Sequence, residues 1–183
     1  MPSSELTSFA LVIVALLILI RWSRHVRLVS SERAWRSREL RDAEIVYAEQ
    51  VFKANGPVTL VAKVDRGYCD VRGVITLVEL KTRHADRPYL SDVIELSAQR
   101  LAVRTQTGAR VAEYGYVLTQ RPGSKLRFPH RVNLLSTEEV IAVARRREAI
   151  LGGKAVAQYA CSQGLCSRCV FKHECKFAAD PLA

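Results

Sequence analysis

The sequence predicts an α/β domain with a mixed β-sheet flanked by helices, preceded by an N-terminal transmembrane helix. Three observations lead to this prediction: an unbroken apolar run near the N-terminus, strand-like apolar runs that alternate with helical patterns, and turn residues between them. The chain of 183 residues has room for one ordinary domain and an appendage. We divide it into a membrane anchor (1–22), a basic juxtamembrane helix (23–42), an α/β domain (43–160) and a cysteine cluster (161–178).

The N-terminal apolar segment has the length of a short membrane span. Residues 9–20 are apolar without a break, and the wider segment 6–22 has 17 residues with three polar ones inside. A bilayer needs about 17–25 residues. The leading residues lack the basic stretch and small-residue cleavage site of a secretory signal peptide. Arginines follow the segment, so the positive-inside rule puts the N-terminus outside and the domain in the cytoplasm. We expect a single-pass inner (cytoplasmic) membrane protein; a buried helix of a soluble protein is the alternative.

The charge balance favours polyanionic partners. Lys and Arg number 28 against 18 for Asp and Glu, which gives a net charge of +10. Nucleic acid and the anionic face of a membrane both fit this balance, and a merely solvated basic surface is the plain alternative. The run Arg145, Arg146, Arg147 lies on a predicted helix and is a candidate for contacts with nucleic-acid phosphates.

Apolar periodicity and turn residues place the elements of the domain. Helices are expected over 31–54, 91–105, 136–151 and 154–160, and strands over 57–65, 75–82, 111–120 and 128–135. Asn55-Gly56-Pro57 ends the first helix, and Ser136-Thr137-Glu138-Glu139 is a capping box that starts the third.

The strand around Glu79 and Lys81 carries the candidate chemistry. Side chains alternate across a strand, so these two residues must project from the same face. Asp65 ends the apolar run before it. Two carboxylates are enough to hold Mg²⁺, which lowers the pKa of a bound water and clamps a phosphate. A lysine beside them orients that water or stabilises developing negative charge. A chance pair of surface charges is the alternative.

A further acid is expected from the first predicted helix. Glu44 and Glu49 both lie there, and the sequence does not choose between them. A solvated helix face is the alternative role for each.

Four cysteines crowd into the C-terminal segment. Cys161, Cys166, Cys169 and Cys175 are separated by four, two and five residues. Four thiolates suit tetrahedral zinc or a [4Fe–4S] cluster, and spacing alone does not separate the two. Cys161 is preferred over Cys69 as the fourth ligand because it requires no long-range closure.

These motifs together resemble the PD-(D/E)xK nuclease superfamily, in its RecB-like branch. The resemblance is carried by Val64-Asp65, by Leu77-Val78-Glu79-Leu80-Lys81-Thr82 and by Cys166-x₂-Cys169-x₅-Cys175. CRISPR-associated RecB-like exonucleases and AddB-type nucleases are similar in these features. The resemblance implies a restriction-endonuclease-like core, Asp65 and Glu79 as ligands of Mg²⁺ or Mn²⁺, Lys81 as the catalytic lysine, and a [4Fe–4S] cluster in preference to zinc.

The resemblance is incomplete at two places. The branch tends to carry Gln-x₃-Tyr on the following helix; Gln99 matches, whereas Val103 stands at the tyrosine position. Its first cluster cysteine normally lies well upstream, and here no cysteine precedes Cys69.

The resemblance implies a metal-dependent deoxyribonuclease that acts on single strands or ends, and the N-terminal apolar segment, which the resemblance does not cover, predicts that it is membrane-anchored. A noncatalytic nucleic-acid-binding module with a zinc or iron–sulfur knuckle is one alternative, and a duplex-specific endonuclease of the same superfamily is another. The sequence contains no Gly-x₄-Gly-Lys-[Ser/Thr] motif, so the chain as given is not a complete helicase–nuclease.

Overall fold

A computed structural model describes residues 13–21, 35–157, 166, 169–170 and 172–175. Residues 13–21 are helical, and the rest of the predicted anchor lies outside the described residues. Within the described ranges, no helix combines the length and the apolar character needed to cross a membrane. The chain divides into two units, residues 1–140 and residues 141–183.

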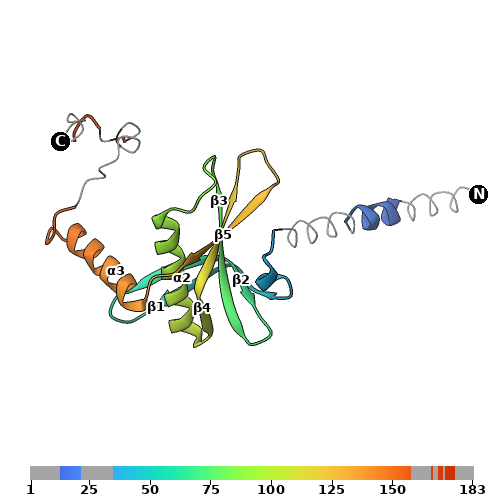
Figure 1. Cartoon of the computed structure of the whole chain (residues 1–183), viewed down its shortest axis with the longest axis horizontal. Helices are drawn as coiled ribbons and strands as arrows, with labels where there is room; N and C mark the ends of the chain where they lie inside the picture. Colours follow the sequence, from blue (N-terminus) through green and yellow to red (C-terminus); the bar gives the residue numbers. More distant parts are fainter. Residues whose placement is uncertain (1–12, 22–34, 158–165, 167–168, 171, 176–183) are drawn as a thin grey trace, which may run out of the picture. The chain divides into compact units, whose positions relative to one another are not determined.

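The first unit contains a five-stranded mixed sheet with the strand order β1-β2-β3-β4-β5, which confirms the predicted α/β class. Helix α2 (Leu90–Thr107) connects β3 to β4, and this pair is parallel; the other neighbouring pairs are antiparallel. Figure 1 shows the strands with α2 packed along them. The strands are β1 (Glu44–Ala54), β2 (Leu60–Cys69), β3 (Val74–Thr82), β4 (Arg110–Gln120) and β5 (Arg127–Asn133).

Both faces of the sheet are covered. Leu77 of β3 packs in one apolar cluster with Leu96 and Val103 of α2. Its neighbour Val78 packs in a second cluster with Trp35 and Leu40. Because successive side chains of a strand point to opposite faces, α2 covers one face and the segment before β1 covers the other. This two-sided burial explains why β3 reads as a continuous apolar run.

The predicted first helix (31–54) is wrong over its described part. Residues 35–43 contain only the 3₁₀ turn η1 (Arg38–Leu40), and β1 follows at Glu44. The expected basic helix over 23–42 is likewise absent from 35–42, while 23–34 lie outside the described residues. β-Branched and aromatic residues fill β1, and their preference for strands combines with the antiparallel ladder to β2. Glu44 and Glu49 are therefore strand residues.

The third predicted helix is confirmed as α3 (Thr137–Leu151). Its capping box forms as expected: the Ser136 amide donates to the Glu139 carboxylate at 2.7 Å, and the Glu139 amide donates to the Ser136 hydroxyl at 3.2 Å. The short helix expected over 154–160 is absent from 154–157, and 158–160 lie outside the described residues.

Gly115 allows β4 to approach both β3 and α2. A Cβ atom there would lie 3.0 Å from the Leu77 carbonyl oxygen and 3.4 Å from the Leu96 side chain. A backbone oxygen within a ladder cannot move aside, so Gly115→Ala should cost about 1–3 kcal/mol of the free energy of unfolding. Denaturant unfolding measures the loss. Gly56→Ala is the matched control, because its Cβ would meet nothing within 4 Å. Equal stability of the two variants would contradict the prediction.

Candidate active site

The predicted charged pair of β3 lies on the face covered by α2. Glu79 is buried, with 4% of its surface exposed, and the Lys81 ammonium lies 2.8 Å from its carboxylate. Because side chains alternate along a strand, both point to the same face of the sheet. The buried stretch of β3 ends at Glu79, so Glu79 lies at the boundary between the core and the more exposed end of the strand.

Asp65 reaches the same place from β2. The ladder between β2 and β3 has Arg66 and Val78 as its last pair at this end, and continuing its register places Asp65 opposite Glu79. The Asp65 carboxylate accepts a hydrogen bond from the backbone amide of Leu80 at 3.0 Å. Beyond the last ladder pair, this side-chain hydrogen bond connects β2 to β3. It holds Asp65 next to Leu80, the residue between Glu79 and Lys81.

The side chain of Gln99, on α2, forms hydrogen bonds to both β2 and β3. Its side-chain nitrogen donates to the Glu79 carboxylate at 2.7 Å and to the Lys63 carbonyl at 2.9 Å. Gln99 is 1% exposed, and its side-chain oxygen is buried without a hydrogen-bond partner in the part of the chain that the structure describes. Val103, where the RecB-like branch tends to have tyrosine, is fully buried in the apolar core.

Glu95 is a member of the site that the sequence analysis missed. Its carboxylate lies 2.7 Å from the Lys81 ammonium, so Lys81 is held between Glu79 and Glu95. Glu95 precedes Gln99 by four residues, which puts both on one face of α2. This four-residue spacing from Gln99 is the sequence signal that could have identified Glu95.

Burial and nearby charges shift the pKa values of Glu79 and Lys81. Burial raises the pKa of Glu79, and the nearby charges of Asp65 and Glu95 add to the rise; hydrogen bonds from Lys81 and Gln99 offset part of it. Burial alone would lower the pKa of Lys81, but its hydrogen bonds and ion pairs with Glu79 and Glu95 outweigh burial and raise that pKa. The raised pKa keeps Lys81 protonated at neutral pH, which suits a hydrogen-bond donor and does not suit a base.

The donor set fits a hard divalent cation that keeps waters of its own. Among the described residues, no group of three or more Asp, Glu, His or Cys side chains is arranged to hold a metal. Mg²⁺ needs only one or two carboxylates and completes its shell with water and substrate oxygens. Asp65 and Glu79 supply two, and the unpartnered Gln99 oxygen beside Glu79 is a further hard acceptor.

Glu44 and Glu49 occupy other positions. Glu49 forms an ion pair with Lys63 at 2.5 Å, with both side chains more than half exposed, and it has a left-handed backbone with φ of 52°. Glu44 begins β1 opposite Cys69 and is exposed. Glu95, from the helix after β3, is the additional acid that contacts Lys81 beside Glu79.

The loop after β3 forms a separate polar cluster. Asp86 accepts hydrogen bonds from the Thr119 hydroxyl at 2.5 Å and pairs with the His130 ring at 2.8 Å. The hydrogen bonds from Thr119 and His130 lower the pKa of Asp86. This cluster joins the loop to β4 and β5 and was not predicted.

The predicted cysteine cluster is described only in part. Cys161 lies outside the described residues, whereas Cys166, Cys169 and Cys175 lie within them. The Cys169 amide donates to the Cys166 carbonyl at 3.2 Å. Cys69 belongs to β2 and packs against the core cluster beneath α2. Arg145, Arg146 and Arg147 are exposed on α3.

The fold and site together define an α/β protein in which the buried Glu79 and Gln99 form a network with the partly exposed Lys81, next to an aspartate. No protein-family model matches the sequence, and no curated protein matches it. Among solved structures, the chain is similar to one described as the crystal structure of SSO0001. The identity is 15%, the match covers 90% of this chain and 72% of that chain, and the TM-score is 0.48. The function of the site is therefore inferred from its own residues.

Proposed function

We propose that the chain is a metal-dependent deoxyribonuclease with a restriction-endonuclease-like core, acting on single strands or ends of DNA. The observation that supports it is the convergence of Asp65, Glu79 and Lys81 beside Gln99 at the end of the β2–β3 ladder. Two carboxylates can hold the metal ion that activates a water, and one ammonium can donate to the phosphate oxygens, so this set is sufficient for metal-assisted phosphodiester hydrolysis. A net charge of +10 suits a polyanionic substrate.

Each residue has a role that its contacts support. Asp65 and Glu79 hold Mg²⁺ or Mn²⁺, which supplies an activated water and neutralises phosphate charge. Lys81, protonated and anchored by Glu95, donates to the negative charge that develops on the phosphate oxygens. Gln99 fixes the orientation of the Glu79 carboxylate and holds it to β2 through the Lys63 carbonyl.

The remaining parts of the proposal come from the sequence. Residues 1–22 anchor the protein in the cytoplasmic membrane, with the N-terminus outside and the nuclease domain in the cytoplasm. The cysteines Cys161, Cys166, Cys169 and Cys175 hold a [4Fe–4S] cluster, with Zn²⁺ and Cys69 as the alternative metal and ligand. Arg145, Arg146 and Arg147 contact DNA phosphates.

A noncatalytic nucleic-acid-binding module is the second candidate. The double ion pair of Lys81 with Glu79 and Glu95 favours it, because a closed network of this kind also serves a purely structural role. In that case the site would hold α2 to β3 and would have no need for a metal.

Cleavage of end-labelled DNA separates the two candidates. The full chain, purified anaerobically in detergent, should degrade single strands or ends with Mg²⁺ or Mn²⁺ and should be inactive in EDTA. Lys81→Ala should lower the rate by about 10²- to 10³-fold, because the phosphate charge loses its donor. The matched control is Lys125→Ala, which removes an exposed lysine from the β4–β5 turn and should cleave like wild type.

Folding of each variant is checked by circular dichroism, and Lys81→Arg provides a variant that keeps the charge but changes its geometry. A wild-type chain as inert as Lys81→Ala with both metals would rule out the nuclease and leave the binding module.

A further inference from the structure

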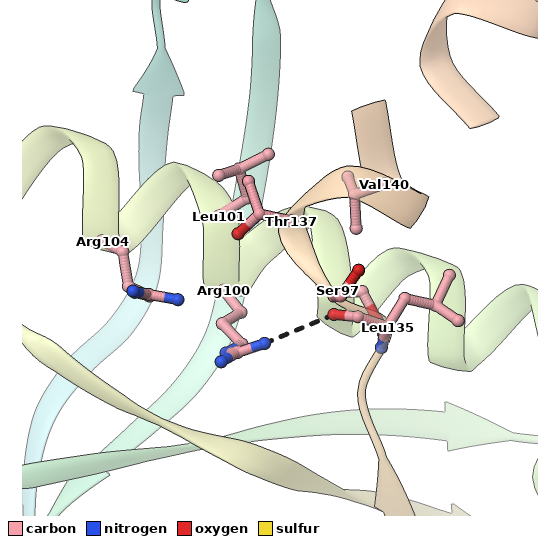
Figure 2. A pocket seen from close by; sticks show the side chains of 8 residues that line it. Ser97, Arg100, Leu101, Arg104, Leu135, Thr137 and Val140 are labelled. Atoms are coloured by element: carbon pink, nitrogen blue, oxygen red, sulfur yellow. Dashed lines mark hydrogen bonds between the residues drawn. The ribbon is translucent and has the colours of Figure 1, made fainter. Parts of the chain in front are cut away.

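A basic cleft lies on the β4 side of α2, away from Glu79. Its volume is about 520 Å³, and the C-terminal half of α2 and the start of β4 supply most of its lining. Three arginines line it: Arg100 and Arg104 from α2 and Arg110 from β4. Figure 2 shows Arg100 and Arg104 projecting from the same side of the helix, next to the smaller pocket that they share with the first turn of α3.

Arg100 is a buried cation with spare hydrogen-bonding capacity. One of its terminal nitrogens donates to the Leu135 carbonyl at 3.3 Å, and the other lies 3.6 Å from the Glu113 carboxylate. The side chain is 10% exposed, and its Nε atom is buried without a partner among the described residues. Buried polar groups normally have partners, so this guanidinium has donor capacity that its neighbours do not use.

The surroundings of Arg100 do not balance its charge. Burial and the positive charge of Arg104 both lower the pKa of Arg100, and the opposing carboxylate of Glu113 is 91% exposed. Arg110 donates to the Arg72 carbonyl, which is neutral. Three arginine residues and one solvated carboxylate thus line the cleft, a balance that favours an anion.

We propose that this cleft binds phosphate carried by a nucleotide or by a nucleic-acid strand. Guanidinium groups donate two parallel hydrogen bonds to phosphate oxygens, and the volume of the cleft is that of a small-ligand site. The strand-bound form rests on the proposed nuclease function, whereas phosphate binding itself does not. At a rise of about 1.5 Å per residue, Arg104 lies about 14 Å along α2 from Glu95, so one strand can reach both sites.

Binding without metal tests the proposal separately from cleavage. In EDTA, fluorescence anisotropy of a labelled single-stranded oligonucleotide is compared for the wild-type full chain, Arg104→Gln/Arg110→Gln and Arg121→Gln/Lys125→Gln. Both double variants remove two exposed positive charges, at opposite ends of β4. The cleft variant should raise the Kd about tenfold or more and reduce the salt dependence by about 1.4, as two lost phosphate contacts require. The control variant should change the Kd less than about threefold.

Inorganic pyrophosphate and a mononucleotide form the second arm, read out by the thermal melting temperature. If either compound raises the melting temperature of wild type but not that of Arg104→Gln/Arg110→Gln, and the oligonucleotide affinity of this variant is unchanged, the ligand is a small phosphate ester. Loss of oligonucleotide affinity in the cleft variant alone identifies a strand. If the cleft and control variants behave alike in both arms, the proposal is overturned. A chain that cleaves no DNA but passes this test keeps the cleft and loses only the nuclease.

Discussion

Replacing Glu79 by glutamine should remove most DNA cleavage and yet make the folded protein more stable at neutral pH. The amide cannot serve as an anionic metal ligand, so the rate with Mg²⁺ or Mn²⁺ should fall by at least about 10²-fold. It keeps the shape of the side chain and accepts the hydrogen bond from Gln99 through its one oxygen, but it loses the ion pair with Lys81. Lys81 retains its ion pair with Glu95 at 2.7 Å, so the variant leaves that ammonium paired.

The gain in stability of Glu79→Gln over wild type should increase as the pH rises. Burial raises the pKa of Glu79 above its ordinary value of 4.5. Below pH 4.5 the carboxyl is protonated in the folded and the unfolded chain, so wild type and variant have similar stability. As the pH rises through the folded-state pKa, the unfolded chain binds fewer protons, and the free energy of unfolding of wild type falls. Glutamine does not titrate, so the difference in favour of the variant widens over this interval.

Denaturant unfolding at several pH values measures the stability, and cleavage of end-labelled DNA measures the activity. Glu148→Gln is the control, because it makes the same chemical change at an exposed position of α3. It should leave both quantities close to those of wild type. A Glu79→Gln variant that still cleaves DNA would show that Glu79 is not a required metal ligand. A stability advantage that shrinks as the pH rises would contradict a raised pKa of Glu79 in the folded chain.

The sequence predicted the elements whose signals are local. The apolar run of β3 and the helical period of α2 gave boundaries within a few residues of those observed, and the capping box placed the start of α3. The pairing of Glu79 with Lys81 followed from strand geometry, because residues two apart on a strand share a face in any fold.

The parts that could not be predicted depend on contacts distant in sequence. The bulky apolar residues before Asn55 fit a helical spacing as well as a strand, and only the ladder to β2 decides between them. The left-handed backbone conformation of Glu49 has no sequence signal of its own, because φ is positive at a residue that is not glycine. Glu95 enters the site because α2 turns one particular face toward β3, and that rotation is fixed by Leu96 and Val103 in the core.

The start of α2 depends on one buried carboxylate, and Asp92→Ala should cost about 3–5 kcal/mol of the free energy of unfolding. Asp92 is 3% exposed. It accepts a hydrogen bond from the Tyr89 amide at 2.7 Å, as the second half of a capping box, and two from the Arg83 guanidinium at 2.7 and 3.2 Å. Removing the carboxylate takes away the cap and leaves Arg83 without its counter-charge. The Arg83 Nε atom already has no hydrogen-bond partner within the described ranges.

The pH dependence of this contribution is opposite to that of Glu79. Burial alone would raise the pKa of Asp92, but the hydrogen bonds and charge of Arg83 and the Tyr89 amide outweigh it and hold the pKa below its ordinary value of 3.8. The stabilisation is therefore complete above pH 3.8 and is lost as the pH falls through the lower folded-state pKa. Asp92→Ala should lack this loss, so the two stability curves should converge in acid.

A double-mutant cycle with Arg83→Ala isolates the pair from the cap. We expect a coupling free energy of about 1–3 kcal/mol between Arg83 and Asp92, measured by denaturant unfolding at neutral pH. Asp42→Ala, at an exposed position, is the control and should change stability by less than about 0.5 kcal/mol. Additive effects of Arg83→Ala and Asp92→Ala would mean that the cap alone stabilises α2. Because α2 also carries Glu95 and Gln99, a coupled pair would make this buried ion pair a support of the candidate active site, one to two turns away along the helix.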